Sequence, residues 1–371
     1  MPTNPQHIPK HAAPHAPDMV RFRQAGATVL LSTDISAAAE HARATLYAYA
    51  VDPGPDAHWS ITVTLDPQAA DWKHSAEVRP CPVEIGSGLS ARHHKSDQAD
   101  VFRVEDHRTT ITLDQARHTI DVRCADPDAA VHFTARLVRQ AMTAQLLAAG
   151  AAYAHTAAVS VGGRGVLISG HRHRGKTTTL TAVLRHLPAD FVTNDRLLIT
   201  AEEGNLRGHA WPAHMRAGVG TLLAYPDLKD LVPAQYRSLG RADLWKLKSK
   251  VSVEPADFPR LIHDGTVTGS CPVDIMIWPD IAPQHQGVTT NVVEPDEVRE
   301  RLLTTRLFMV DPASGVSSHI NHWLVAAPPA DQQAATLAGI ADAIARSVPC
   351  YRVRAGGDPA ILARAVAELV P

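Results

Sequence analysis

The chain contains few aromatic residues and few cysteines. Phe, Trp and Tyr make up 5% of its 371 residues, so stacking platforms for single-stranded nucleic acids are scarce. None of its four cysteines lies in a CxxC pair, which argues against a zinc ribbon and against a thioredoxin-like redox motif. We therefore expect free thiols in a reducing compartment.

An excess of one charge is also missing. The 36 Lys and Arg residues are balanced by 38 Asp and Glu residues, so no basic field predicts a nucleic-acid partner. No stretch approaches the ~18 apolar residues of a membrane-spanning helix. Residues Met1 to Pro17 lack the apolar run of a secretory signal. These absences predict a soluble, cytoplasmic protein without a nucleic-acid or membrane partner.

Apolar residues make up 45% of the chain, enough to build a real core. Repeated prolines predict a disordered tail over residues 1–18. Residues 19–126 are expected to form an N-terminal α+β domain with an antiparallel sheet and a long loop over 66–99. Its predicted elements are a helix over Asp34–Tyr49, capped by Asp34 or Ser36, and strands over Ser60–Leu65, Val101–Glu105, Thr109–Leu113 and Thr119–Cys124.

Residues 127–371 are expected to form an α/β domain, because strands alternate with helices there. The predicted helices run from Pro127 to Gly150, from Lys176 to Leu187, from Asp331 to Arg346 and from Pro359 to Leu369. The predicted strands are Ala157–Val161, Gly165–Ser169, Phe191–Val192, Leu197–Thr200, Val273–Trp278 and Cys350–Val353. The first two strands should form a hairpin around Gly162 and Gly163.

A phosphate-binding signature lies between the second and third of these strands. The segment from Gly170 to Thr177 fits GxxxxGK[ST], with an apolar strand before it and a helix after it. Its glycines permit close approach of the backbone to phosphate, and the helix N-terminus adds N–H donors. We expect Lys176 to reach the β- and γ-phosphates of ATP and the Thr177 hydroxyl to bind Mg²⁺. The predicted nucleotide-binding residues are Gly170, His171, Arg172, His173, Arg174, Gly175, Lys176, Thr177 and Thr178.

The variable positions of this signature carry unusually large side chains. His171, Arg172, His173 and Arg174 stand where small residues are common, so their side chains must point outward. Two interpretations remain open: they add positive potential around the triphosphate or the acceptor, or they simply face solvent.

Two further residues flank the signature at strand ends. His155 lies 21 residues before Lys176, and Asp195 lies 19 residues after it. Strand ends near a phosphate loop converge at one edge of an open α/β sheet. A carboxylate at that edge can hold Mg²⁺ or take a proton from an attacking hydroxyl. Alternatively, Asp195 is a turn residue and His155 is a structural histidine.

The run from His155 through the phosphate loop to Thr193-Asn194-Asp195 resembles the catalytic domain of HPr kinase/phosphorylase over about residues 130–280. That resemblance implies a P-loop core of the type shared with phosphoenolpyruvate carboxykinase. It makes Asp195 the base and a metal ligand, His155 an active-site residue and Thr177 a metal ligand. It also carries Arg216 over as an active-site residue.

The chain departs from that family at several positions. Asn194 replaces the first Asp of the family's Asp-Asp pair, and His214 stands where a metal-binding Glu is expected. Lys250 is our choice for a late phosphate contact, with Lys248 second; for each, a solvated strand edge is the alternative. The N-terminal domain also differs from that of the family.

These observations predict an ATP- and Mg²⁺-dependent kinase. Its acceptor would be a hydroxyl of a peptide, a protein or a small metabolite, and the family suggests self-association. Two alternatives stay open. One is a nucleotide-binding regulatory or scaffold protein without transfer, favoured by the missing Glu. The other is a decarboxylating carboxykinase, for which we find no complete set of metal ligands.

Overall fold

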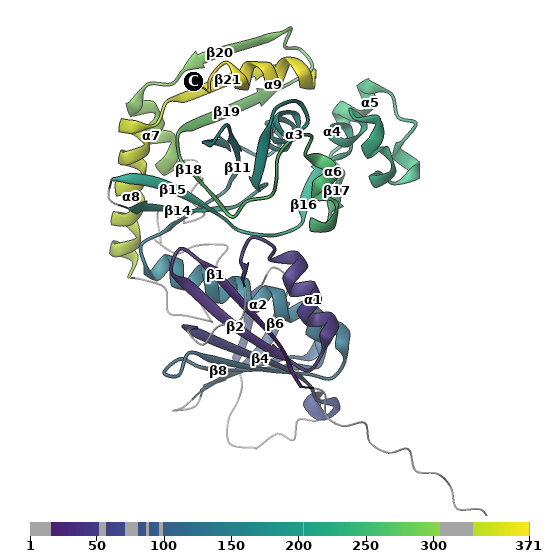
Figure 1. The fold of residues 1–371 in the computed structure, drawn as a ribbon, viewed down its shortest axis with the longest axis vertical. Helices are drawn as coiled ribbons and strands as arrows, with labels where there is room; N and C mark the ends of the chain where they lie inside the picture. Colours follow the sequence, from purple (N-terminus) through teal and green to yellow (C-terminus); the bar gives the residue numbers. More distant parts are fainter. Residues whose placement is uncertain are drawn as a thin grey trace, which may run out of the picture.

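The computed structural model describes residues 16–51, 57–70, 81–86, 89–95, 99–202, 204–304 and 329–370. They form a mixed α/β protein built on several sheets. In Figure 1 the N-terminal sheet with its two helices lies below, and the remaining sheets and helices lie above it. Of the tail predicted over 1–18, residues 1–15 lie outside the described residues, and a strand already begins at Asp18.

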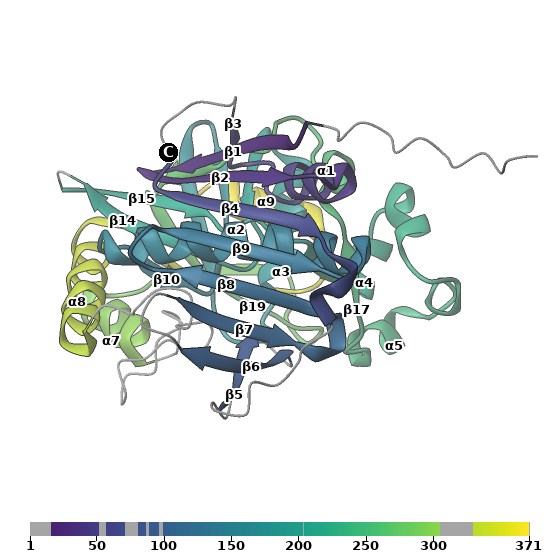
Figure 2. The same cartoon turned by 90° about the horizontal axis from the view of Figure 1, so that it is seen from below.

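The N-terminal unit is organised by one nine-stranded sheet in the order β3-β1-β2-β4-β9-β8-β7-β6-β5. Figure 2 shows most of these strands lying side by side in front of α2. The strands are β1 (Asp18–Gln24), β2 (Ala27–Thr33), β3 (Ala50–Val51), β4 (Trp59–Leu65), β5 (Cys81–Gly86), β6 (Leu89–Lys95), β7 (Asp100–Val104), β8 (Thr109–Asp114) and β9 (Thr119–Cys124).

The predicted antiparallel character of this sheet is only partly right. Strand β4 pairs in parallel with both β2 and β9, whereas the other pairs are antiparallel. The β1–β2 hairpin was not predicted, although its signal is present in the sequence. Buried residues alternate along both strands, and Ala25 and Gly26 turn with positive φ between them.

The loop predicted over 66–99 is wrong in part. Strands β5 and β6 pair within it, next to β7 at one end of the sheet. In β6 only Leu89 and Ala91 are buried, and polar residues follow them. Such a short apolar signal near a sheet edge is easily read as loop.

Helix α1 (Ser36–Thr45) is shorter than predicted, and its predicted side-chain cap is wrong. The residue before the helix is Ile35, which makes no capping hydrogen bond. The carboxylate of Asp34 instead accepts a hydrogen bond from the backbone N–H of Leu65 in β4. Asp34 therefore joins the helix start to the sheet instead of capping the helix.

Helix α2 (Pro127–Ala148) confirms the prediction of a helix from Pro127 to Gly150. Asp126 caps it by accepting from the N–H of Ala129, and Gly150 follows with φ +86°. Its buried residues, among them Phe133 and Leu137, lie in the same hydrophobic core as the N-terminal sheet. The predicted division at residue 126 stays a prediction, but by its packing α2 belongs with the strands before it.

The second half of the chain contains a six-stranded sheet in the order β13-β11-β12-β19-β21-β20. Its strands β12, β19 and β21 are parallel, and the others pair antiparallel. The strands are β11 (Thr156–Val161), β12 (Arg164–Ser169), β13 (Ala189–Thr193), β19 (Ile275–Ile281), β20 (Val288–Val292) and β21 (Cys350–Ala355).

Both faces of this sheet are covered, which explains the continuous apolar runs of its strands. Val166 and Ile168 face one core with helices α3 (Lys176–His186) and α9 (Pro359–Ala367). Leu167, between them, faces the opposite core with α7 (Pro295–Thr304) and α8 (Ala330–Ser347). That second core also includes the four-stranded sheet β10 (Ala152–Ala154), β14 (Leu197–Glu202), β15 (Asn205–Ala210) and β18 (Ser270–Pro272).

The predicted elements of this half are largely confirmed. The hairpin β11–β12, helices α3, α8 and α9, and strands β13, β14 and β21 lie where the sequence indicated, within a few residues. The strand predicted over Val273–Trp278 begins at Ile275 and continues to Ile281. Strands β15, β18 and β20 and helix α7 were not predicted.

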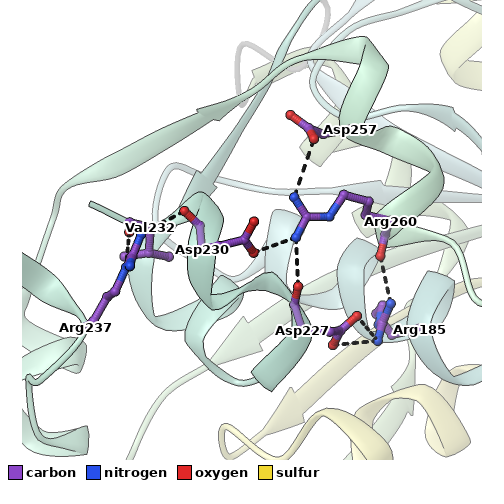
Figure 3. A network of polar contacts seen from close by, with 7 residues as sticks. All are labelled: Arg185, Asp227, Asp230, Val232, Arg237, Asp257 and Arg260. Atoms are coloured by element: carbon purple, nitrogen blue, oxygen red, sulfur yellow. Dashed lines mark hydrogen bonds and ion pairs between the residues drawn. The ribbon is translucent and has the colours of Figure 1, made fainter. Parts of the chain in front are cut away.

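A long excursion separates two short paired strands, β16 (Met215–Gly218) and β17 (Lys250–Val253). It contains α4 (Val219–Leu223) and α5 (Arg241–Lys246), which lie at one side of the molecule in Figure 1. Figure 3 shows the polar network that joins it to α3 and to α6 (Phe258–Leu261). In that network Arg185 donates to both oxygens of Asp227, and Arg260 donates to Asp230.

The N-terminal unit is joined to the rest of the chain by hydrogen bonds around residues 210–212 and Gly269. The Tyr49 hydroxyl donates to the Ala210 carbonyl, and the Gln24 amide donates to the Gly269 carbonyl at 2.6 Å. Trp211 donates from Nε1 to the Thr143 hydroxyl at 2.9 Å. Helix α2 therefore contacts the segment that leads into β16.

Among the helices of the described ranges, none combines the length and the apolar character that a membrane crossing requires.

Candidate functional site

The segment Gly170–Gly175 connects the end of β12 to the start of α3. Gly170 and Gly175 adopt φ of +139° and +98°, and His173 adopts +64°. Only glycine adopts the first two readily. A Cβ on Gly175 would lie 2.2 Å from Cγ1 of Ile281. The loop is thus pressed against the end of β19, where the Ile281 N–H donates to the Arg174 carbonyl at 3.2 Å.

The side chain of Lys176 folds back over this loop. Its Nζ donates to the Gly170 carbonyl at 2.7 Å and to the His171 carbonyl at 3.4 Å, and the residue is 9% exposed. Burial lowers the pKa of Lys176 to about 8; the Asp195 carboxylate opposes this shift, and the charges of Lys250 and Arg172 add to it. The loop therefore holds a poorly solvated cation beside the N-terminus of α3.

The threonines that follow Lys176 make different contacts. The Thr177 hydroxyl donates to Oδ1 of Asn194 at 3.4 Å, and Asn194 is buried at the end of β13. The Thr178 hydroxyl lies 3.0 Å from that of Thr221 in α4. Thr177 is therefore directed toward the residue before Asp195, and Thr178 toward the excursion.

Asp195 and His155 come together beside the loop. Nε2 of His155 lies 3.6 Å from Oδ1 of Asp195, and Nε of Arg196 lies 3.5 Å from Oδ2. The backbone carbonyl of Arg196 fixes the turn after β13. It accepts from the Thr193 hydroxyl at 2.8 Å and from the backbone N–H of Trp211 at 3.3 Å. The Asp195 side chain is 49% exposed, so it can be reached from solvent.

Arg216 and Lys250 lie on the β16–β17 ribbon. The pairs Arg216–Ser252 and Gly218–Lys250 place both cations on one exposed face, while Met215 and Val253 are buried on the other. Because the charge of Lys250 acts on Lys176, this ribbon lies beside the loop. The structure thus brings five of the predicted residues together: His155, Lys176, Thr177, Asp195 and Lys250.

The four outward residues of the loop are exposed, as predicted for side chains that find no room inside it. Of these, Arg174 donates to Oδ1 of Asp280 at 2.8 Å. Asp280 also lies 3.5 Å from Nε2 of His285 and 3.7 Å from Nε of Arg354. The loop is therefore tied to the ends of β19 and β21 by charge as well as by packing.

Three residues next to the turn at Asp195 were not predicted from the sequence. Arg196 contacts Asp195, and Arg196 and Arg139 both lie over the ring of Trp211, with Cζ 4.5 Å and 4.2 Å from its centre. Arg196 could have been noticed, since it follows Asp195 directly. Arg139 lies in the middle of α2 and gives no local signal.

Comparisons with known proteins add no relative: no protein-family model matches the chain, and a search of curated proteins finds no match.

Substituting Gly175 should show how closely the loop is fitted to β19. Gly175→Ala should cost about 1–2 kcal/mol for its positive φ and about 1–3 kcal/mol more for the contact with Ile281. Gly163→Ala, with φ +81° and open space around it, should cost only the first amount. The measurement is urea denaturation. Equal losses in the two variants would contradict the fit, and the double variant Gly175→Ala/Ile281→Ala should lose less stability than the sum of the two single variants.

The low pKa of Lys176 predicts a pH-dependent affinity for inorganic triphosphate. A bound anion favours the ammonium form, so it raises the pKa above its free value of about 8. Above pH 8 the lysine of the free protein is increasingly neutral, so binding of the anion must take up a proton. The affinity should therefore fall by up to about tenfold for each pH unit. Calorimetry in buffers of different ionisation enthalpy measures this uptake. Lys176→Arg, which stays protonated, should show a flat profile; a flat profile in the unsubstituted protein would refute the linkage.

Proposed function

We propose that this protein is an ATP- and Mg²⁺-dependent kinase that transfers the γ-phosphoryl group to a hydroxyl of a peptide, protein or small metabolite. The observation that carries the proposal is the position of Asp195. Its carboxylate lies 3.6 Å from His155 and is close enough to Lys176 to raise the pKa of that lysine. A proton acceptor beside a phosphate-binding cation is the arrangement that phosphoryl transfer to an alcohol requires.

Nucleotide binding is supported by the residues of the loop. The first N–H groups of α3 have no intrahelical partners and favour an anion at that end. The ammonium group of Lys176 donates to two carbonyl oxygens of the loop. Phosphate oxygens of a bound nucleotide can replace these carbonyl oxygens as its acceptors. Lys250 and Arg172 add positive charge nearby. Together these groups suit the β- and γ-phosphates of a P-loop ligand.

The oxygen donors near Thr177 fit a magnesium ion. Thr177, Asn194 and Asp195 supply a hydroxyl, an amide oxygen and a carboxylate, and the first two oxygens lie 3.4 Å apart. Mg²⁺ prefers such donors and usually takes only one or two carboxylates besides phosphates and water. In the described residues no three His, Cys, Asp or Glu side chains gather as a metal site. When bound, the ion would neutralise charge on the phosphates.

In the transfer step, the acceptor oxygen forms a bond to the γ-phosphorus while the bond to the ADP oxygen breaks. Asp195 takes the hydroxyl proton, and Lys176 stabilises the charge on the transferred group. Both contacts of the Asp195 carboxylate with His155 and Arg196 are longer than ordinary hydrogen bonds, so its oxygens retain accepting capacity. His155 holds the carboxylate in place.

A second candidate function is nucleotide binding without transfer. Asn194 occupies the position of the first Asp of the Asp-Asp pair in the family that the sequence resembles, and its side-chain oxygen already accepts from the Thr177 hydroxyl. His214 is exposed where that family has a metal-binding Glu. A regulatory protein needs only the loop, whereas a kinase also needs Asp195.

The described cysteines support the cytoplasmic location that we propose. Cys124, Cys271 and Cys350 are buried free thiols, and burial raises the pKa of each. Free thiols persist in a reducing compartment, which is also where ATP is available.

Asp195→Asn should separate binding from chemistry. The amide keeps the shape but cannot take a proton, so transfer should fall on the order of 10²-fold or more, while ATP affinity stays within a few-fold. Transfer is followed with γ-labelled ATP and a panel of hydroxyl peptides and small alcohols. Asp190→Asn is the matched control, because Asp190 lies in β13 and its carboxylate accepts hydrogen bonds from the backbone N–H and the hydroxyl of Thr266. Near-normal transfer in Asp195→Asn would remove Asp195 as the base, and ATP binding without any labelled acceptor would favour the second candidate.

A further inference from the structure

A cluster of cationic and aromatic side chains lies next to Asp195, and the proposed chemistry does not use it. It consists of Arg139 from α2, Arg196 after β13, Trp211 after β15 and Tyr153 from β10; we call it the arginine–indole cluster. The guanidinium groups lie 4.2 Å and 4.5 Å from the indole centre, and the Tyr153 ring lies 6.0 Å from it. Arg139, Arg196 and Trp211 are partly exposed.

Arg139 carries a charge that the described residues do not neutralise. Its NH1 donates to the Pro212 carbonyl at 3.0 Å, while its Nε is buried without a hydrogen-bond acceptor. No carboxylate of the described ranges pairs with it, and none acts on its pKa. Desolvation, with a smaller contribution from the charge of Arg196, lowers the pKa of Arg139 to about 10. The Tyr153 hydroxyl is buried beside Arg196, whose charge and hydrogen bond act on it.

Arg185 shows what a structural arginine of this chain looks like. It also stacks on an aromatic ring, with Cζ 5.2 Å from the centre of Tyr225, and it donates to a backbone carbonyl, that of Arg260. In addition it forms two 2.9 Å hydrogen bonds to the carboxylate of Asp227 (Figure 3). Arg139 has the ring and the carbonyl but lacks the carboxylate.

We propose that the arginine–indole cluster binds an anionic group, a carboxylate or a phosphate, on the acceptor whose hydroxyl is phosphorylated. The identity of the ligand as an acceptor rests on the proposed function; the binding of an anion does not. A guanidinium presents its N–H donors in a planar fork, which suits the paired oxygens of such a group. Contact with the indole limits the motion of both guanidinium groups.

Asp195 is the residue that the cluster and the nucleotide residues share as a neighbour. The charges that act on Lys176 are those of Asp195, Lys250 and Arg172. The cations that act on Arg139 are Arg196 and Arg136. Asp195 borders both groups, since it also contacts Arg196 and acts on Tyr153. An anion bound at the cluster would therefore bring a neighbouring hydroxyl of the same molecule close to Asp195.

The N-terminal unit contributes to the proposed anion site through helix α2. Helix α2 packs in the core of the nine-stranded sheet and contributes Arg139 to the site. The unit would thus take part in acceptor recognition through a rigid helix, with Thr143 fixing the indole by accepting from Trp211 Nε1 at 2.9 Å.

Anion binding is tested first, without any transfer reaction. Full-length Lys176→Ala protein, which lacks the loop cation, is titrated with malonate and with inorganic phosphate by calorimetry. Adding Arg139→Lys should weaken binding at least tenfold, because the charge stays but the fork is lost. Adding Arg185→Lys should leave it unchanged. Equal binding with and without Arg139→Lys overturns the proposal. If the Arg139→Lys variant has a lowered melting temperature, Trp211→Phe replaces it. This variant keeps an aromatic ring, and its affinity for the anions should fall by less than the tenfold expected for Arg139→Lys.

Acceptor preference is tested second, with γ-labelled ATP and matched pairs. Glycerate is compared with glycerol, and a Ser peptide flanked by Asp with the same peptide flanked by Asn. The anionic member should be preferred at least tenfold in kcat/KM, and Arg139→Lys should abolish the preference with KM for ATP unchanged. Labelling without an anionic preference refutes the cluster's role and leaves the kinase standing. Anion binding that depends on Arg139 without any labelling keeps the cluster as an anion site and refutes the kinase.

Discussion

The burial of β12 on both faces is the constraint on which the candidate site depends. Val166 and Ile168 face the core with α3, and Leu167 faces the core with α8, so the strand cannot shift by one residue without placing every side chain on the wrong face. Its parallel pairing with β19 then sets Gly175 against Ile281. The loop and the start of α3 therefore emerge at a fixed place at the carboxyl edge of the parallel strands.

At that edge the protein holds a cation that is poorly solvated and bonded only to carbonyl oxygens. The cost of desolvating Lys176 is visible in its lowered pKa, and a bound anion would reduce it. Asp195 and His155 arrive from the neighbouring strand ends, and Lys250 from the β16–β17 ribbon. Function therefore depends on residues from separate segments meeting where the loop emerges.

The sequence could predict the loop and its surroundings because the signal there is local. Alternating or continuous apolar residues bounded by glycines marked β11, β12 and α3, and strand ends near the loop indicated that Asp195 and His155 would meet. The contact of Arg139 with Trp211 could not be predicted, because only the packing of α2 against the segment after β15 brings these two residues together. Strand β6 was missed because it contains few apolar residues. Strand β5 and the β1–β2 hairpin were missed although apolar residues alternate along their strands.

The central claim is that the segment Gly170–Thr177 binds the triphosphate of ATP with its γ-phosphate facing Asp195. A crystal structure of the full-length protein with Mg²⁺ and a non-hydrolysable ATP analogue tests it directly. We expect Nζ of Lys176 to leave the Gly170 carbonyl for oxygens of the β- and γ-phosphates, with the terminal phosphate beside Asp195 and His155. A nucleotide bound elsewhere, with Lys176 still on the Gly170 carbonyl, would refute this mode of binding.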